Sequence, residues 1–103
     1  MRITEWLKIL STEQGSDLYL STGAPPCAKF QGVLKPIASD ILQPGEIKEI
    51  AYELMDPTQR TAFETDLEMN LATSISGYGR FRVNIFMQRN EVGIVARNIV
   101  ADI

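Results

Sequence analysis

The chain contains no histidine and a single cysteine, Cys27. Histidine is the side chain that most often ligates metals in proteins and most often acts as a general base. Without it, a serine or cysteine nucleophile would lack its usual base. One cysteine cannot form an internal disulfide, which is compatible with a reducing compartment. We therefore expect no metal site and no catalytic centre within these 103 residues.

Basic charge and long apolar runs are also scarce. Ten Lys and Arg residues stand against 13 Asp and Glu residues, and the net charge of −3 argues against non-specific binding to nucleic acid. No apolar run approaches the roughly 20 residues of a membrane span, and the N-terminus lacks the apolar segment of a signal peptide. A GxxxxGK(S/T) phosphate-binding loop is absent as well. These absences predict a cytoplasmic domain with no nucleic-acid partner.

The length predicts a single domain over residues 1–103. A chain of this length buries enough apolar surface to fold by itself. Its 45% hydrophobic and 22% charged residues are ordinary for a globular protein. Residues 100–103 continue out of the last predicted strand with neither a cap nor a polar tail. We therefore expect the chain to be part of a longer protein.

The segment from Gly77 to Ile99 predicts a hairpin of two strands. Apolar residues occupy every second position from Phe81 to Met87, which is the period of a half-buried strand. Arg89-Asn90-Glu91 is polar and fits the turn, and a β-branched run follows from Val92 to Ile99. Four more strands are predicted earlier in the chain, at Ser16–Ser21, Cys27–Phe30, Val33–Lys35 and Leu67–Ile75.

The N-terminal segment predicts a helix over Thr4–Gln14. Apolar residues recur there at i, i+3, i+4 and i+7, which is the spacing of one helix face. Thr4 is the expected N-terminal cap of this helix, and Gly15 is its expected C-terminal stop.

Two more helices are predicted to follow each other directly. One has Pro44 at its first position and an apolar stripe up to Met55. The other has Asp56 as its N-terminal cap, Pro57 at its first position and Gln59 three residues after the cap. Strands that pair by hairpins, with helices grouped on one face, make an α+β domain. We expect a PAS-like architecture with a largely antiparallel sheet of five to six strands.

The hairpin holds four of the ten basic residues: Arg80, Arg82, Arg89 and Arg97. In an antiparallel pair that turns near Asn90, Arg82 faces the region of Arg97. Two adjacent guanidiniums repel each other unless an anion lies between them or carboxylates flank them. Two alternatives therefore stay open, namely a local anion site or ion pairs on the sheet with Asp17, Glu91 or Asp102.

Several segments together resemble the N-terminal domain of the type IV pilus retraction ATPases, the PilT/PilU family of secretion-type hexameric motors. The matching segments are 15–20, 23–26, 31–32, 54–60 with Phe63, and 79–86 with Gln88, Arg89 and Arg97. They cover essentially the whole chain in order and with matching spacing. The turn at Gln88-Arg89-Asn90 is closer to the PilU branch.

The resemblance implies a function for the arginines. In this family, a short linker joins the PAS-like domain to a RecA-like ATPase core, which would begin after residue 103. That core would bind ATP and Mg²⁺, and arginines of the N-terminal domain would sense the γ-phosphate as the domains close. Arg82 and Arg97 match these positions, and Arg80 is a third candidate.

The resemblance also implies partners and a location. The implied partners are neighbouring subunits of a homohexamer, an inner-membrane platform protein of the pilus and a paralogous retraction ATPase. The location would be the cytoplasmic side of the inner membrane, at the base of the pilus, and the role would be pilus retraction and twitching motility.

Two alternative functions to that of a retraction motor stay open. One is a PAS-like module that binds a small ligand or a protein. The other is the same domain in a pilus-assembly or type II secretion ATPase. A ligand sensor needs a hollow core, whereas the bulky residues Phe81, Val83, Ile85 and Leu71 predict a filled one.

Overall fold

A computed structural model describes residues 1–100 and shows an α+β domain of three helices and six strands. The elements, in chain order, are α1 (Arg2–Thr12), β1 (Asp17–Leu20), β2 (Cys27–Phe30), β3 (Val33–Pro36), α2 (Glu46–Leu54), α3 (Pro57–Asp66), β4 (Glu68–Ile75), β5 (Gly79–Gln88) and β6 (Glu91–Ile99). The six predicted strands are confirmed, as is the α+β class. In residues 1–100, the helices are too short or too polar to span a bilayer.

All six strands form one antiparallel sheet in the order β3-β2-β1-β6-β5-β4. Four of the five neighbouring pairs are consecutive in the chain, whereas β1 and β6 come from opposite ends of it. This one long-range pairing joins an N-terminal and a C-terminal three-stranded meander. The sheet is therefore antiparallel throughout, and β1 and β6 are its two central strands.

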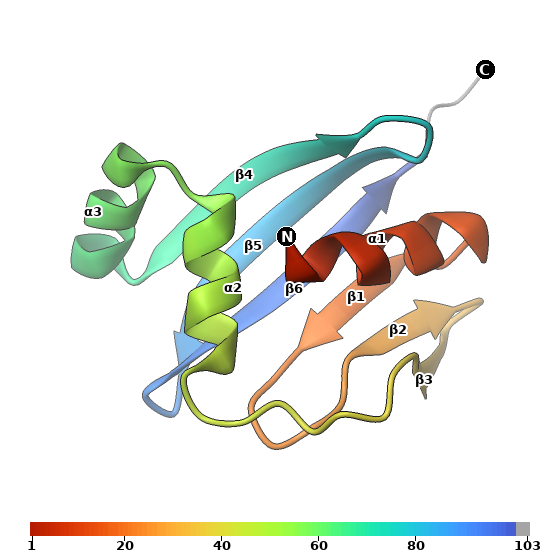
Figure 1. Cartoon of the computed structure of the whole chain (residues 1–103), viewed down its shortest axis with the longest axis horizontal. Coiled ribbons are helices and arrows are strands. Elements are labelled where there is room, and N and C mark those ends of the chain that lie inside the picture. Colours follow the sequence, from red (N-terminus) through yellow and green to blue (C-terminus); the bar gives the residue numbers. More distant parts are fainter. Residues whose placement is uncertain (101–103) are drawn as a thin grey trace.

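The helices leave one face of the sheet uncovered. Figure 1 shows α1 and α2 lying across one face, with α3 beside the start of β4. The core lies under α1 and α2, where Phe81, Val83 and Ile85 of β5 are buried together with Leu7 and Leu10 of α1. Leu71 of β4, the fourth residue from which a filled core is expected, is partly buried against this cluster. The opposite face carries the alternate residues of every strand.

The ends of α1 differ from the prediction. The helix starts at Arg2, with Met1 as its N-terminal cap, and Thr4 lies in its first turn. At the other end, Gln14 takes the left-handed conformation with φ 59°, and the Gly15 N–H donates to Leu10 O. Gly15 is therefore not the left-handed residue. A β-carbon at position 15 would lie 2.6 Å from Leu10 Cδ1, so the position needs a residue without a side chain.

The start of α2 also differs, whereas the start of α3 matches the prediction. Gly45 caps α2 with φ 86°, so Pro44 precedes the helix instead of occupying its first position. The reason is that Gly45 can adopt a left-handed conformation that most residues avoid. In α3, Asp56 and Gln59 form the predicted reciprocal capping box.

The β5–β6 turn is tighter than predicted. It consists of Arg89 and Asn90, with φ 52° and 63°, and Glu91 is already the first residue of β6. Two central residues with positive φ are typical of a type I′ turn, whose twist matches that of the flanking strands. This turn sets the register of the whole hairpin.

Candidate functional site

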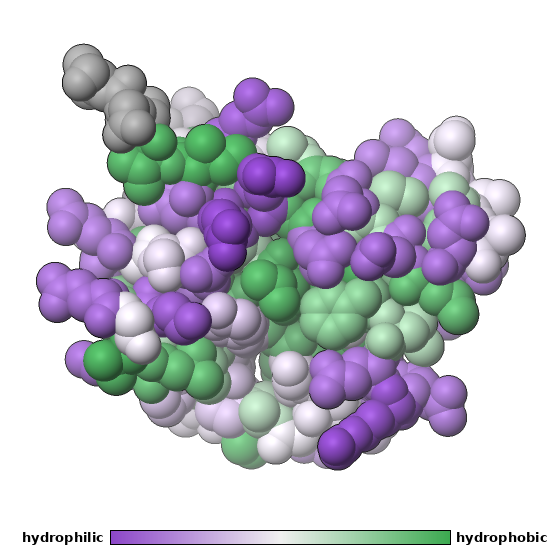
Figure 2. Space-filling model, turned by 180° about the vertical axis from the view of Figure 1, so that it is seen from behind, coloured by the Kyte–Doolittle hydropathy of each residue, from purple (hydrophilic) through white to green (hydrophobic). Residues whose placement is uncertain are grey.

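The uncovered face of the sheet carries the predicted arginines. The register places Lys29 beside Asp17, Asp17 beside Arg97, and Arg97 beside Arg82, in one row across four strands. Figure 2 shows the molecule from the side opposite to Figure 1, so that this face is turned toward the viewer, with hydrophilic side chains around a hydrophobic area near its middle. We call it the open face, defined by the row residues and by Arg80, Asn84, Asn70 and Val95.

Arg82 and Arg97 are direct cross-strand neighbours on the open face, as the sequence predicted. The side chain of Arg97 donates from Nε to Asp17 Oδ1 at 3.0 Å. Its exposed fraction is 69%, whereas that of the Asp17 side chain is 8%. Arg82 is exposed, and within residues 1–100 its side chain forms no ion pair or hydrogen bond.

Of the three carboxylates considered as partners, the structure selects Asp17 for Arg97. Asp17 is the first residue of β1. Glu91 lies at the far end of the hairpin and hydrogen-bonds Gly45. Asp102 lies outside the described residues. The ion pair with Asp17 engages only Nε, which is one of the three nitrogens of the guanidinium.

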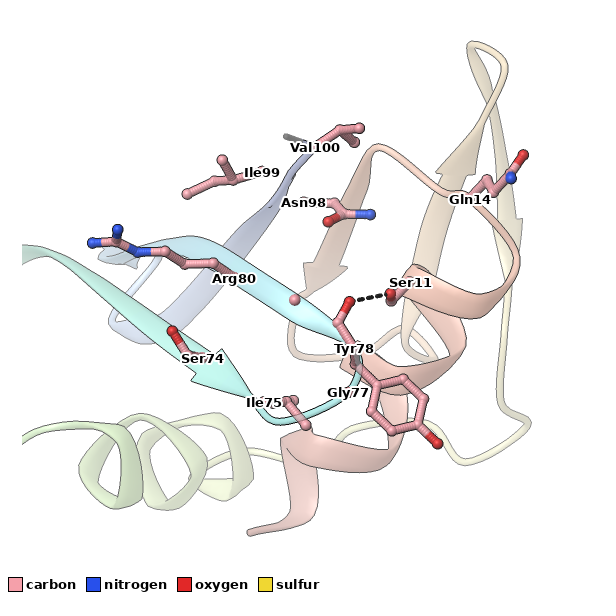
Figure 3. Close-up of a pocket in the computed structure, with 11 residues that line it drawn as sticks. Ser11, Gln14, Ser74, Ile75, Gly77, Tyr78, Arg80, Asn98, Ile99 and Val100 are labelled. Atoms are coloured by element: carbon pink, nitrogen blue, oxygen red, sulfur yellow. Dashed lines mark hydrogen bonds between the residues drawn. The ribbon is translucent and has the colours of Figure 1, made fainter. Parts of the chain in front are cut away.

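Arg80 lies one step further along the open face, and Arg89 does not belong to it. Arg80 is opposite Ile99 and Ser74, and it lines a groove of about 960 Å³ at the end of the sheet. Figure 3 shows its guanidinium pointing away from the contact between Ser11 and the backbone of Tyr78. Arg89 lies in the β5–β6 turn.

The structure adds two asparagines that the sequence analysis did not single out. A hollow of about 300 Å³ beside Arg82 and Arg97 is lined by Asn70, Asn84 and Val95, among others. The Asn84 side-chain amide donates to Asn70 Oδ1 at 3.0 Å. Asn84 has the same period-two position as Arg82, which is the signal that could have revealed it. Cations with neighbouring amides suit an anionic ligand, because both supply N–H donors.

Proteins similar to this chain are known. The chain is 38% identical over all of its 103 residues to the type IV pilus ATPase PilU of Pseudomonas aeruginosa, and 36% identical over 99 residues to the type IV pilus retraction ATPase PilT of the same strain. The chain resembles the pilus retraction ATPases along its whole length. It spans 27% of PilU and 29% of PilT, where it matches the N-terminal part. The slightly higher identity to PilU agrees with the sequence of the turn at Arg89.

Solved structures show the same fold. The pilus retraction motor PilT, crystallised with bound ADP, matches 94% of this chain with a TM-score of 0.81 and 31% identity, and the match covers 29% of that protein. The ATPase DotB of Legionella pneumophila matches 97% of this chain and 28% of its own length, with a TM-score of 0.75 and 22% identity, which indicates a shared fold alone. No family model matches the chain. The sequence predicts a PAS-like domain, and the match to PilT shows that this domain has the fold of the PilT N-terminal region.

Proposed function

We propose that this chain is the nucleotide-sensing N-terminal domain of a hexameric ATPase that powers type IV pilus retraction and twitching motility. A RecA-like core would follow residue 103 and would hold ATP and Mg²⁺. The chain itself would not hydrolyse ATP. It would move as a lid on that core and bring Arg82, Arg97 and, as a third contact, Arg80 to the γ-phosphate.

The observation that carries this proposal is the arginine pair on the open face. Arg82 and Arg97 are cross-strand neighbours, and within residues 1–100 only one of them has a carboxylate partner. Two adjacent cations with one neutralising carboxylate favour an added anion. The similarity to the ATPases along the whole chain makes a nucleotide phosphate the best candidate for that anion.

The other parts of the proposal depend on the relatives alone. The partners would be neighbouring subunits of a homohexamer, the pilus platform protein of the inner membrane and a paralogous retraction ATPase. The protein would lie on the cytoplasmic side of that membrane, at the base of the pilus. The alternative is the same domain in a related pilus-assembly or type II secretion ATPase. DotB supports it only in that the fold also occurs in another ATPase.

The test is ATP hydrolysis by the full-length protein that contains this chain. We compare wild type with Arg82→Ala and Arg97→Ala, and we use Arg89→Asn as a control that removes a charge from the distant turn. Asparagine suits the positive φ of position 89. An arginine that contacts a transferring phosphoryl group contributes about 10³–10⁵ in rate in well-studied cases, or about 4–7 kcal/mol.

We expect both alanine variants to hydrolyse ATP at least about tenfold more slowly than wild type and the Arg89 control to match wild type. The isolated domain should keep its stability in Arg82→Ala, because Arg82 is exposed. Wild-type rates in folded hexamers of both alanine variants would refute the proposal. A large loss of domain stability with normal ATPase activity would assign the arginines to the fold instead.

A further inference from the structure

The buried carboxylate of Asp17 makes the two arginines of the open face different from each other. Among residues 1–100, Asp17 is the one buried side chain that is polar or charged, with 6% of the residue exposed. Burying a carboxylate is costly unless it is paired and hydrogen-bonded. An aspartate at the start of a central strand therefore needs a specific partner on the neighbouring strands.

The partner is Arg97 and not the lysine on the other side. Lys29 faces Asp17 from β2, but the Lys29 Nζ lies over the Tyr19 ring at 5.8 Å from its centroid, and within residues 1–100 it forms no ion pair. Arg97 faces Asp17 from β6, and its Nε donates to Asp17 Oδ1 at 3.0 Å. The carboxylate therefore holds one edge of the Arg97 guanidinium.

The backbone next to this pair is held as well. The Asn98 N–H donates to Ser16 O at 3.0 Å, and the Asn98 side chain donates to Gly15 O at 3.3 Å. These contacts join the end of β6 to the segment that enters β1. Both members of the pair are thus fixed on central strands. No side chain of residues 1–100 pairs with the two terminal nitrogens of the guanidinium, and the Arg97 side chain is 69% exposed.

Arg82 has no comparable support. It faces Ala72 on one side and Arg97 on the other, and within residues 1–100 its side chain has no hydrogen-bond partner. Its charge reaches the open face, but no group among residues 1–100 sets its orientation. Arg97 is therefore an oriented donor, whereas Arg82 is an exposed point of positive charge.

We propose that Asp17 is a positioning residue, which orients the guanidinium of Arg97 so that its two terminal nitrogens contact the phosphate of the nucleotide. This inference rests on the proposed nucleotide-sensing function. Lysine at position 82 keeps the charge that Arg82 supplies. Lysine at position 97 has a single nitrogen, which cannot serve Asp17 and a phosphate with the geometry of a guanidinium.

The main experiment measures MgATP hydrolysis by the full-length protein. We expect Arg97→Lys to lose about as much activity as Arg97→Ala, at least about tenfold, whereas Arg82→Lys should retain clearly more activity than Arg82→Ala. Asp17→Asn and Asp17→Ala should lower the rate in the wild-type background. In the Arg97→Ala background, neither Asp17 substitution should lower the rate of hydrolysis further, because Asp17 acts through Arg97.

A second measurement on the 103-residue chain separates positioning from folding. Hydrogen exchange of the guanidinium Nε–H groups, followed by NMR, should show a protected Nε–H for Arg97 and an unprotected one for Arg82. The protection should be lost in Asp17→Ala, and thermal unfolding monitors whether the variant still folds. Asp17→Asn has nearly the same shape and provides a folded variant where Asp17→Ala is too unstable.

The possible results separate the two proposals. If Arg97→Ala lowers hydrolysis but Arg97→Lys restores it, or if the effects of Asp17 and Arg97 substitutions add, the positioning role is wrong and the nucleotide-sensing function stands. An unprotected Arg97 Nε–H in the folded wild-type chain also rules out positioning. If neither Arg82→Ala nor Arg97→Ala changes hydrolysis, both proposals are refuted.

Discussion

Glu91, the first residue of β6, accepts a hydrogen bond from the backbone N–H of Gly45, the cap of α2, at 3.0 Å. The same carboxylate oxygen lies 3.5 Å from Thr22 Oγ1 in the loop after β1. One side chain thus joins three segments that are far apart in the sequence. A carboxylate at this place also faces the positive end of the α2 dipole.

We expect Glu91→Ala to lower the free energy of unfolding by about 1–2 kcal/mol, because it leaves the Gly45 N–H without its acceptor. Glu91→Gln keeps an acceptor oxygen and should cost less. The measurement is urea denaturation of the 103-residue chain. Glu53→Ala is the matched control, since Glu53 is an exposed glutamate of α2, the helix that Gly45 caps. Equal losses in the Glu91 and Glu53 variants would contradict this role.

Gly15→Ala tests the close packing behind the open face. The added β-carbon would lie 2.6 Å from Leu10 Cδ1, 3.0 Å from Phe30 Cε1 and 3.3 Å from the Lys29 carbonyl oxygen. Because one of these neighbours is backbone, we expect a loss of about 1–3 kcal/mol, as in other overpacked sites. Thermal unfolding measures it, with Glu13→Ala on the exposed side of the same turn as the control. An unchanged melting temperature would mean that Leu10 and Phe30 rearrange freely.

The carboxyl group of Glu46 has a lowered pKa. The larger cause is the hydrogen bond from the Gln43 backbone N–H, and the second is the hydrogen bond from Arg2 at 2.9 Å. Arg2→Ala should therefore raise the pKa of Glu46 and still leave it below that of a free glutamate. NMR titration of the Glu46 carboxyl carbon measures both values. A pKa that does not move would show that the Arg2 pair is broken in solution.

The sign of the pH effect follows from this lowered pKa. A carboxyl whose pKa is lower in the folded chain stabilises the fold above the pKa of the unfolded state, which is about 4.3 for glutamate. That contribution is lost as the pH falls through the folded-state pKa. Stability should therefore depend less on pH in this acidic range in Arg2→Ala than in wild type.

The phenol of Tyr52 has a raised pKa. Partial desolvation is the largest cause, followed by the hydrogen bond to Glu64 Oε1 at 3.1 Å and the negative charge of that carboxylate. Neutral tyrosine is thus favoured by the fold, so its contribution is present below the unfolded pKa of about 10 and is lost as the pH rises through the folded value. We expect Glu64→Gln to lower the pKa of Tyr52 in an ultraviolet titration. A titration curve identical to wild type would show that desolvation alone sets the shift.

The hairpin and its arginine pair could be predicted from the sequence, because their causes are local. Alternation from Phe81 to Met87 indicates a strand, and the turn next to Asn90 sets which residues face each other. The capping box of Asp56 and Gln59 is equally local and was found at the predicted place. Short-range hydrogen bonds and side-chain periodicity specify such features whatever the rest of the chain does.

The pairing of β1 with β6 could not be predicted, and it changes the meaning of the arginines. Asp17 and Arg97 are 80 positions apart, and their contact exists because two meanders join along their inner strands. No local pattern shows that join, since it depends on how α1 and α2 cover the shared core. The residues alone put two arginines side by side. Only the packed sheet shows that a buried carboxylate holds one of them, whereas no carboxylate of residues 1–100 pairs with the other.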